Sequence, residues 1–247
     1  MMLAGIREVA VVVTPRDLAL YQSLLGHGAR FGLDIEYVVQ EEPNGLPEAY
    51  LLCEDFLEGD ASLMILGDNL FFGPGLGASL KEETELASGA KIFLSRVSSP
   101  GQYGVAKLSE ATNSIESIVE KPQEWVSDLA ITGMYLLDGS APSRSKKLIP
   151  STRGELEIVD LLESYLLEEM LFYRELPRGA VWLDAGTPEG LSSASEFVRV
   201  VQTRQNRKIS CPEEIFFSGA SQRENHLEEL TSNMPLSGYR EYLEGFL

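Results

Sequence analysis

The chain has 247 residues, 44% of them hydrophobic, and a formal net charge of −18 at pH 7. This length and hydrophobic content suffice for one large packed domain with an appendage, and they exclude the disordered and fibrous classes of protein. The excess of Asp and Glu disfavours nucleic acid as a partner, because binding a duplex requires many phosphate contacts from Lys and Arg.

No stretch of the sequence approaches 18 consecutive apolar residues, and the first residues lack the pattern of a secretory signal. We therefore expect no membrane span, no membrane partner and a cytoplasmic location. The two cysteines, Cys53 and Cys211, are too isolated for a zinc knuckle or a disulfide framework.

The first part of the chain alternates short β-rich runs with helical patterns. Ala61–Leu66 is too short for a helix, predicts a buried parallel strand, and is followed by Asp68. Ligands lie beyond the carboxyl ends of strands in open α/β sheets, so Asp68 is a candidate site residue. In chain order the predicted elements are strand Val9–Thr14, helix Asp17–Leu25, strand Ile35–Val39, helix Gly45–Leu57 and strand Ala61–Leu66.

The second part continues this alternation, and Val181–Leu183 is again followed by an acid, Asp184. The pattern predicts an α/β fold in three layers with a mostly parallel mixed sheet, in which residues 1–210 form the main domain and 211–247 a small helical appendage. The predicted strands are Lys91–Val97, Tyr103–Leu108, Ser117–Val119, Ile131–Leu137 and Val181–Leu183, and the helices are Leu76–Ala87, Gly154–Glu169 and Pro188 to about Gln205.

Two acids at strand ends favour a metal site. Asp68 and Asp184 could jointly hold Mg²⁺, which proteins bind through one or two carboxylates together with phosphate oxygens of the substrate. The alternative is that either Asp caps a turn or the following helix. Spacing alone leaves this choice open.

Charged residues flank the ends of other predicted elements. Glu120 and Lys121 follow a strand, and Pro122 fixes the backbone so that both charges can face a cleft. Arg153 precedes a helix, where a cation gains nothing from the macrodipole, so a bound anion explains it better. Gly45, in a turn before a helix, permits close backbone approach to a flat ligand. An ordinary turn or ion pair is the alternative at each position.

Taken together, these segments resemble the glucose-1-phosphate thymidylyltransferase family, from Met1 nearly to the C-terminus. The motifs occur in the family's order, which is far more specific than any one of them. They are Leu66–Gly73 (LGDNLFFG), Tyr103–Val105 (YGV), Glu120–Pro122 (EKP), Thr132–Tyr135 (TGMY), Arg153–Glu157 (RGELE), Trp182–Thr187 (WLDAGT) and Cys211–Ile215 (CPEEI).

The resemblance implies a nucleotidyltransferase in which the phosphate of glucose 1-phosphate attacks the α-phosphorus of dTTP, giving dTDP-glucose and pyrophosphate. Positioning, Mg²⁺ and fixed cations suffice for such a transfer. The Gln40 amide would offer a donor and an acceptor to the base. The resemblance assigns Gln40, Gly45 and Leu46 to thymine, Gly104, Glu120 and Gly133 to glucose, Lys121 and Arg153 to its phosphate, and Asp68 and Asp184 to Mg²⁺.

Of these residues, Lys121, Arg153, Asp68 and Asp184 are expected to act in catalysis, and Asp68 also to meet the nucleotide. The resemblance further implies a homo-oligomer, the family form being a tetramer. The apolar residues Phe197, Val198, Val200 and Val201 on one predicted helix support this assembly, although they could instead pack on their own domain.

The chain departs from the family pattern at its N-terminal end. It lacks the family's first strand, the G-G-x-G-T-R-L loop and a Lys that hold the triphosphate, so we expect impaired activity and two strand edges facing an unfilled slot. Glu48 stands where Gln is usual, and its negative charge is expected to weaken nucleotide binding.

Two other functions stay open at this point. One is a catalytically silent module that binds a sugar phosphate or dTDP-sugar and regulates a partner. The other is a sugar-phosphate nucleotidyltransferase that uses UTP, because thymine and uracil differ only by one methyl group.

Overall fold

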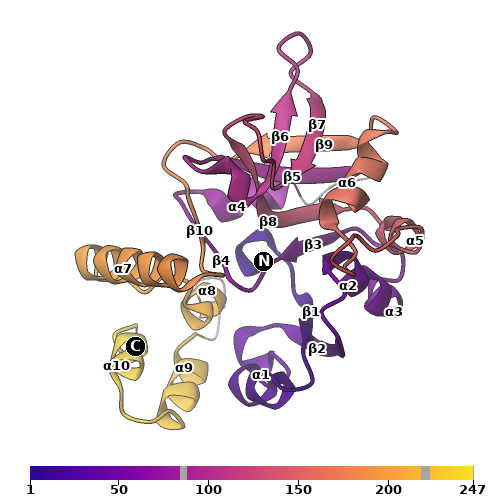
Figure 1. The fold of residues 1–247 in the computed structure, drawn as a ribbon. Helices are drawn as coiled ribbons and strands as arrows, with labels where there is room; N and C mark the ends of the chain where they lie inside the picture. Colours follow the sequence, from indigo (N-terminus) through magenta and orange to yellow (C-terminus); the bar gives the residue numbers. More distant parts are fainter. Residues whose placement is uncertain (84–87, 218–222, 247) are drawn as a thin grey trace.

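The computed structural model describes residues 1–83, 88–217 and 223–246, and its largest element is a mixed β-sheet (Figure 1). The strands of this sheet are β3 (Ser62–Ile65), β5 (Ala90–Arg96), β6 (Gly104–Leu108), β7 (Ile115–Glu120), β8 (Leu129–Leu137) and β9 (Leu171–Glu175). Across the sheet β7, β6, β8, β5 and β9 are neighbours in that order, and β3 also pairs with β8.

Helices connect the strands and cover the sheet. None of the described helices has both the length and the apolar character needed to cross a membrane. The α-helices are α1 (Leu18–Leu25), α2 (Leu46–Leu52), α3 (Glu54–Leu57), α4 (Leu76–Glu83), α5 (Ala141–Ser145), α6 (Ile158–Leu166), α7 (Pro188–Gln205), α8 (Pro212–Phe217), α9 (Arg223–Ser232) and α10 (Gly238–Glu244), and the 3-10 helices are η1 (Met2–Ala4), η2 (Ala29–Phe31) and η3 (Pro100–Gln102).

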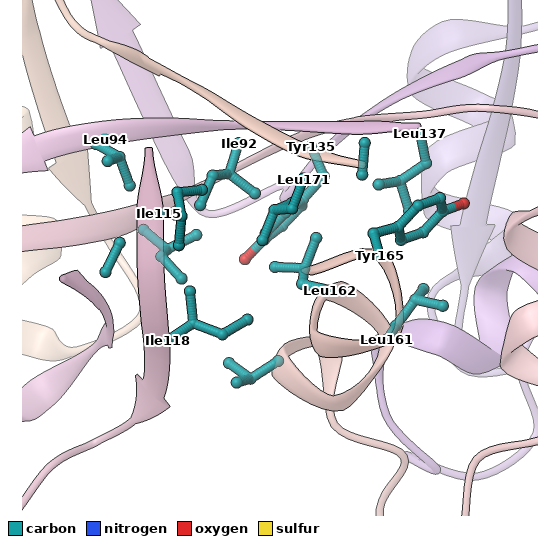
Figure 2. Packing of buried hydrophobic residues seen from close by; sticks show 14 of the residues in the cluster. Ile92, Leu94, Ile115, Ile118, Tyr135, Leu137, Leu161, Leu162, Tyr165 and Leu171 are labelled. Carbon is teal, nitrogen blue, oxygen red and sulfur yellow. The ribbon is translucent and has the colours of Figure 1, made fainter. Parts of the chain in front are cut away.

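The strand β8 lies between two hydrophobic cores, and all nine of its residues are buried. Successive side chains of a strand point to opposite faces of the sheet. On one face Tyr135 belongs to the core that contains Leu162 of α6 (Figure 2). On the other face Met134 belongs to a second core with Leu80 of α4. Helices on both faces give the three layers that the sequence predicts.

Two further pairs of strands lie outside this sheet. β1 (Glu8–Val13) runs parallel to β2 (Asp34–Val39), and β4 (Asn69–Phe72) runs antiparallel to β10 (Val181–Asp184). Figure 1 shows β1, β2 and α1 at the end of the molecule opposite the β6–β7 hairpin. Within the described ranges β1 pairs only with β2 and β3 only with β8, so each keeps one edge without a strand.

The last helices, α8 to α10, enclose a small core of their own. Phe216 of α8 anchors this unit on the N-terminal part, because a Cβ placed on Gly32 would lie only 2.2 Å from the Phe216 ring. A domain boundary near residue 210 stays a prediction. The fully buried members of this core are Cys211, Phe217, Leu227 and Leu243.

The structure confirms the α/β class and the mixed sheet and corrects several details. Antiparallel pairs outnumber parallel ones among the described strands, and β3, predicted to be parallel, pairs antiparallel with β8. An apolar run reveals burial but not the direction of its partner. The predicted helix 45–57 is interrupted at Cys53. Helix 76–87 is described as far as Glu83, and its remainder lies outside the described residues.

Candidate active site

A cavity of about 350 Å³ lies between the β2–α2 connection and the segments that follow β7 and precede α6. Glu157, which the sequence analysis did not single out as a site residue, also lines it. The structure therefore gathers one half of the predicted site into one cavity. Its predicted residues are Gln40, Gly45, Leu46, Glu120, Lys121 and Arg153.

Gly45 closes one wall of the cavity by backbone contact with Leu156. Gly45 has φ +103° and forms a parallel bridge with Leu156, whose amide donates to the Asn44 carbonyl at 2.7 Å. A Cβ on Gly45 would lie 2.0 Å from the Leu156 carbonyl oxygen. Only glycine fits both this φ and this contact.

The Gln40 side chain is tied down by its neighbours. Its Nε2 donates to the Gly45 carbonyl at 3.1 Å and to Glu48 Oε2 at 2.6 Å. The family resemblance implies that this amide gives a donor and an acceptor to a base. In the structure the amide donor is engaged within the chain and the oxygen is the group left for a ligand, and the assignment of Gln40 to the base stays a prediction.

Two cations, Lys121 and Arg153, line the cavity together with the acids Glu120, Glu155 and Glu157. Arg153 Nη2 lies 2.7 Å from Glu157, which also accepts from the Ser151 hydroxyl at 2.6 Å. Lys121 Nζ lies 3.8 Å from Glu120. Because both cations are about half exposed, they remain available to an anion in the cavity.

The pKa values of two of these carboxylates, Glu120 and Glu157, shift in opposite directions. Burial raises the pKa of Glu120, although the positive charges of Lys121 and Arg153 oppose this. Burial also acts to raise the pKa of Glu157, but hydrogen bonds from Ser151 and Arg153 outweigh it and lower that pKa. Glu157 is therefore the stable counterion of Arg153.

Gly104 and Gly133 lie against polar groups rather than in open turns. Gly104 pairs with Glu120 across β6 and β7, and an added Cβ would lie 3.2 Å from Glu120 Oε2. The Gly133 amide on β8 donates to Asn69 Oδ1 at 3.1 Å, and a Cβ there would lie 2.5 Å from the same oxygen. A side chain at either position would displace its polar neighbour.

The acids Asp68 and Asp184 come together through the pairing of β4 with β10. A Cβ on Gly186 would lie 3.0 Å from an Asp68 carboxylate oxygen and 3.1 Å from one of Asp184, so these two oxygens lie at most about 6 Å apart. One Mg²⁺ with bonds of about 2.1 Å would bring two ligand oxygens within about 4 Å of each other. Neither acid has an ion-pair partner in the described part of the chain.

The two carboxylates fit a divalent cation whose remaining ligands are phosphate oxygens of the substrate. Asp184 Oδ1 accepts from the Gly186 amide at 2.9 Å and Asp68 Oδ1 from Asn69 Nδ2 at 2.7 Å, which leaves one oxygen of each acid without a hydrogen-bond donor among the described residues. No group of three or more His, Cys, Asp and Glu side chains suited to a metal occurs among the described residues. A cation here would need ligands from its substrate.

Asn69 is a structural residue of the site that the sequence analysis did not assign. Its Oδ1 accepts from the Trp182 indole at 2.5 Å as well as from Gly133. This oxygen joins β4, β8 and β10. Its place directly after Asp68 in the LGDN segment was the available signal.

The acid pair lies beside the cavity, not in its lining. Asp68 lines a separate cavity of about 570 Å³ against α7. Burial and then the charges of Glu120 and Asp68 raise the pKa of Tyr135, so this residue of β8 is within electrostatic reach of both groups. Tyr103 links them as well, since its carbonyl accepts from the Lys121 amide at 3.0 Å and its ring lies 5.0 Å from Trp182.

Known proteins resemble this chain over most of its length. A family model described as nucleotidyl transferase matches residues 1–200. The glucose-1-phosphate thymidylyltransferase of Xanthomonas campestris pv. campestris is 42% identical over 243 residues, which cover 98% of this chain and 82% of that one. The enzyme of that name from Neisseria meningitidis is also 42% identical, with 98% and 84% covered.

Solved structures show the same likeness. A Bacillus anthracis crystal structure, named as a glucose-1-phosphate thymidylyltransferase in complex with sucrose, has a TM-score of 0.73 and 37% identity, covering 80% of this chain and 78% of that one. UDP-glucose pyrophosphorylase complexed with UDP-glucose has a TM-score of 0.68 at 23% identity, covering 83% and 84%, and supports the fold alone.

Proposed function

The chain belongs to the glucose-1-phosphate thymidylyltransferase family of nucleotidyl transferases, and on that premise we propose that it joins the thymidylyl group of dTTP to glucose 1-phosphate. The observation that carries the proposal is the cavity that Gln40, Gly45 and Leu46 line together with the cations Lys121 and Arg153 and the acids Glu120, Glu155 and Glu157. Such a lining offers uncharged groups to a nucleoside, cations to a phosphate and acceptors to sugar hydroxyls.

In the proposed reaction a phosphate oxygen of glucose 1-phosphate attacks the α-phosphorus of dTTP. The new P–O bond forms as the bond from the α-phosphorus to the bridging oxygen breaks, and pyrophosphate leaves with that electron pair. No protein nucleophile is needed, because positioning and charge stabilisation suffice. Lys121 and Arg153 reduce the repulsion between the attacking phosphate and the triphosphate, and Arg153 can hold a phosphate bidentately.

The sugar is proposed to lie against Glu120, Gly104 and Gly133. Glu120 accepts hydrogen bonds from sugar hydroxyls, and the glycines leave room for the ring. Asp68 and Asp184 are proposed to hold Mg²⁺, which when bound would neutralise charge on the phosphates of the nucleotide. The acids keep their carboxylates together through the pairing of β4 with β10.

Assembly into a homo-oligomer remains part of the proposal. Phe197 of α7 packs on Phe72 with ring centroids 5.5 Å apart, whereas Leu191 and Val200 of the same helix are 57% and 42% exposed. The helix thus satisfies only part of its apolar surface within the chain.

The proposed function is tested by assaying pyrophosphate release from dTTP and glucose 1-phosphate, with calorimetric titration of both ligands in parallel. Binding of both ligands together with release of pyrophosphate is the result that the proposal expects. Binding with no turnover at all would favour the silent module, and equal use of UTP would widen the substrate class. Failure to bind either ligand contradicts the proposal.

Arg153→Ala is expected to weaken glucose 1-phosphate binding about tenfold or more and dTDP binding far less, because Arg153 is proposed to meet the sugar's phosphate. Calorimetry with each ligand measures the difference. Arg178→Ala, which removes a cation from a residue outside both cavities, is the matched control. Equal losses for the two ligands in Arg153→Ala would contradict the placement.

A further inference from the structure

The orientation of the Gln40 amide is dictated by its neighbours. Its Nε2 carries two protons and meets two partners, the Gly45 carbonyl at 3.1 Å and Glu48 Oε2 at 2.6 Å. A carbonyl and a carboxylate can only accept hydrogen bonds, so the nitrogen must lie on their side. The Gln40 backbone is fixed too, because its amide donates to the Val13 carbonyl at 2.9 Å.

The oxygen of this amide is consequently the group that Gln40 offers to a ligand. Gln40 lines the cavity, whereas Glu48 is not part of the lining. The amide oxygen has no hydrogen-bond donor among the described residues. It is also not one of the fully buried polar atoms that lack a partner, so a ligand can reach it. The cavity thus presents an acceptor, and no donor, from this side chain.

Glu48 is well placed to keep this arrangement. It lies in the first turn of α2, where the helix dipole favours a negative charge. Its second oxygen, Oε1, accepts from Asn44 Nδ2 at 2.8 Å, so both carboxylate oxygens are held. A neutral amide at this position would have one accepting oxygen and could not accept at both ends.

We propose that Glu48 is a positioning residue for base selection, which locks Gln40 with its amide oxygen toward the nucleobase. This inference rests on the proposed function. An amide oxygen in this position favours thymine and uracil, whose N3 carries a proton, over cytosine, whose N3 is itself an acceptor. Two acceptors facing each other leave a buried polar group unpaired, which costs about tenfold or more in affinity. Thymine and uracil share the N3–H group, so the lock does not separate them.

The test titrates dTDP, UDP and dCDP calorimetrically into the 247-residue chain and into Glu48→Ala and Glu48→Gln. In the unchanged chain dTDP and UDP should bind similarly, and dCDP about tenfold or more weaker. In Glu48→Ala the preference for dTDP over dCDP should shrink to within about threefold, because the released amide can turn and donate to cytosine. Glu48→Gln should retain the preference, since its oxygen can still accept from Gln40.

Glu42→Ala is the control for charge. Glu42 is exposed and does not line the cavity, so its loss should change the affinity for all three diphosphates by the same factor and leave their ratio unaltered. Gln40→Ala, which removes the acceptor itself, should also abolish the preference and does not depend on how Glu48→Ala folds.

The outcomes separate the two proposals. If the preference for dTDP over dCDP survives in Glu48→Ala or in Gln40→Ala, the lock is refuted while the proposed function stands. If the unchanged chain binds none of the three diphosphates, the proposed function fails, and the lock fails with it.

Discussion

Asp184→Asn is expected to weaken Mg²⁺ binding in the presence of dTTP, and any turnover that depends on it, by about 10²-fold or more. The reason is the loss of one of two carboxylates whose oxygens are the proposed metal ligands. The fold should persist, because the Asn oxygen can still accept the 2.9 Å hydrogen bond from the Gly186 amide. Titration of Mg²⁺ against a dTTP-saturated chain, followed by pyrophosphate release, measures both effects.

Asp68→Asn should behave in the same way, since the two acids lie side by side. Asp55→Asn serves as the control, because Asp55 is an exposed acid of α3 that lines neither cavity. A Mg²⁺ affinity that stays unchanged in both Asp184→Asn and Asp68→Asn would remove the metal site from the proposal.

Gly45→Ala is expected to destabilise the chain by about 3 kcal/mol or more and to abolish nucleotide binding at ordinary ligand concentrations. The methyl group would lie 2.0 Å from the Leu156 carbonyl oxygen, so the backbone of the β2–α2 connection or of residue 156 must move. That movement would displace Gln40 and the Glu48 carboxylate together. Urea unfolding and dTDP titration report the two effects.

Gly59→Ala is the matched control for Gly45→Ala. Gly59 has φ +86°, close to the strained φ of Gly45, yet a Cβ there meets nothing within 4 Å. Gly59→Ala should therefore lower the free energy of unfolding only by the left-handed backbone penalty of about 1 kcal/mol, and it should leave dTDP binding intact. Equal losses of stability in the two variants would show that the contact with Leu156 is unimportant.

The sequence located most strands because burial on both faces leaves a continuous apolar run. β8 is the clearest case, since every residue from Leu129 to Leu137 is buried. Strand partners were less predictable: the run that became β3 signals burial, and its antiparallel pairing depends on the distant β8. The short strands β4 and β9 went unpredicted because neither run shows a period long enough to recognise.

The sequence could predict which residues belong to the candidate site, but not how their side chains are oriented. The segments that contain Asp68 and Asp184 are recognisable, and the pairing of β4 with β10 then places the two acids together. The sequence could not show that Gln40 gives its amide protons to Gly45 and Glu48, because that choice is made by the turn between β2 and α2.

Among the described strands β1 pairs with β2 alone, and a strand edge of this kind bears on how the protein behaves in solution. A bare strand edge is a template on which another copy can pair. The net charge of −18 opposes such encounters, because identical molecules repel one another. Salt shortens the range of this repulsion from about 10 Å at 0.1 M to about 3 Å at 1 M. Colloidal stability is therefore greatest in dilute buffer well above the isoelectric point of about 4.5, and precipitation follows when either condition is lost.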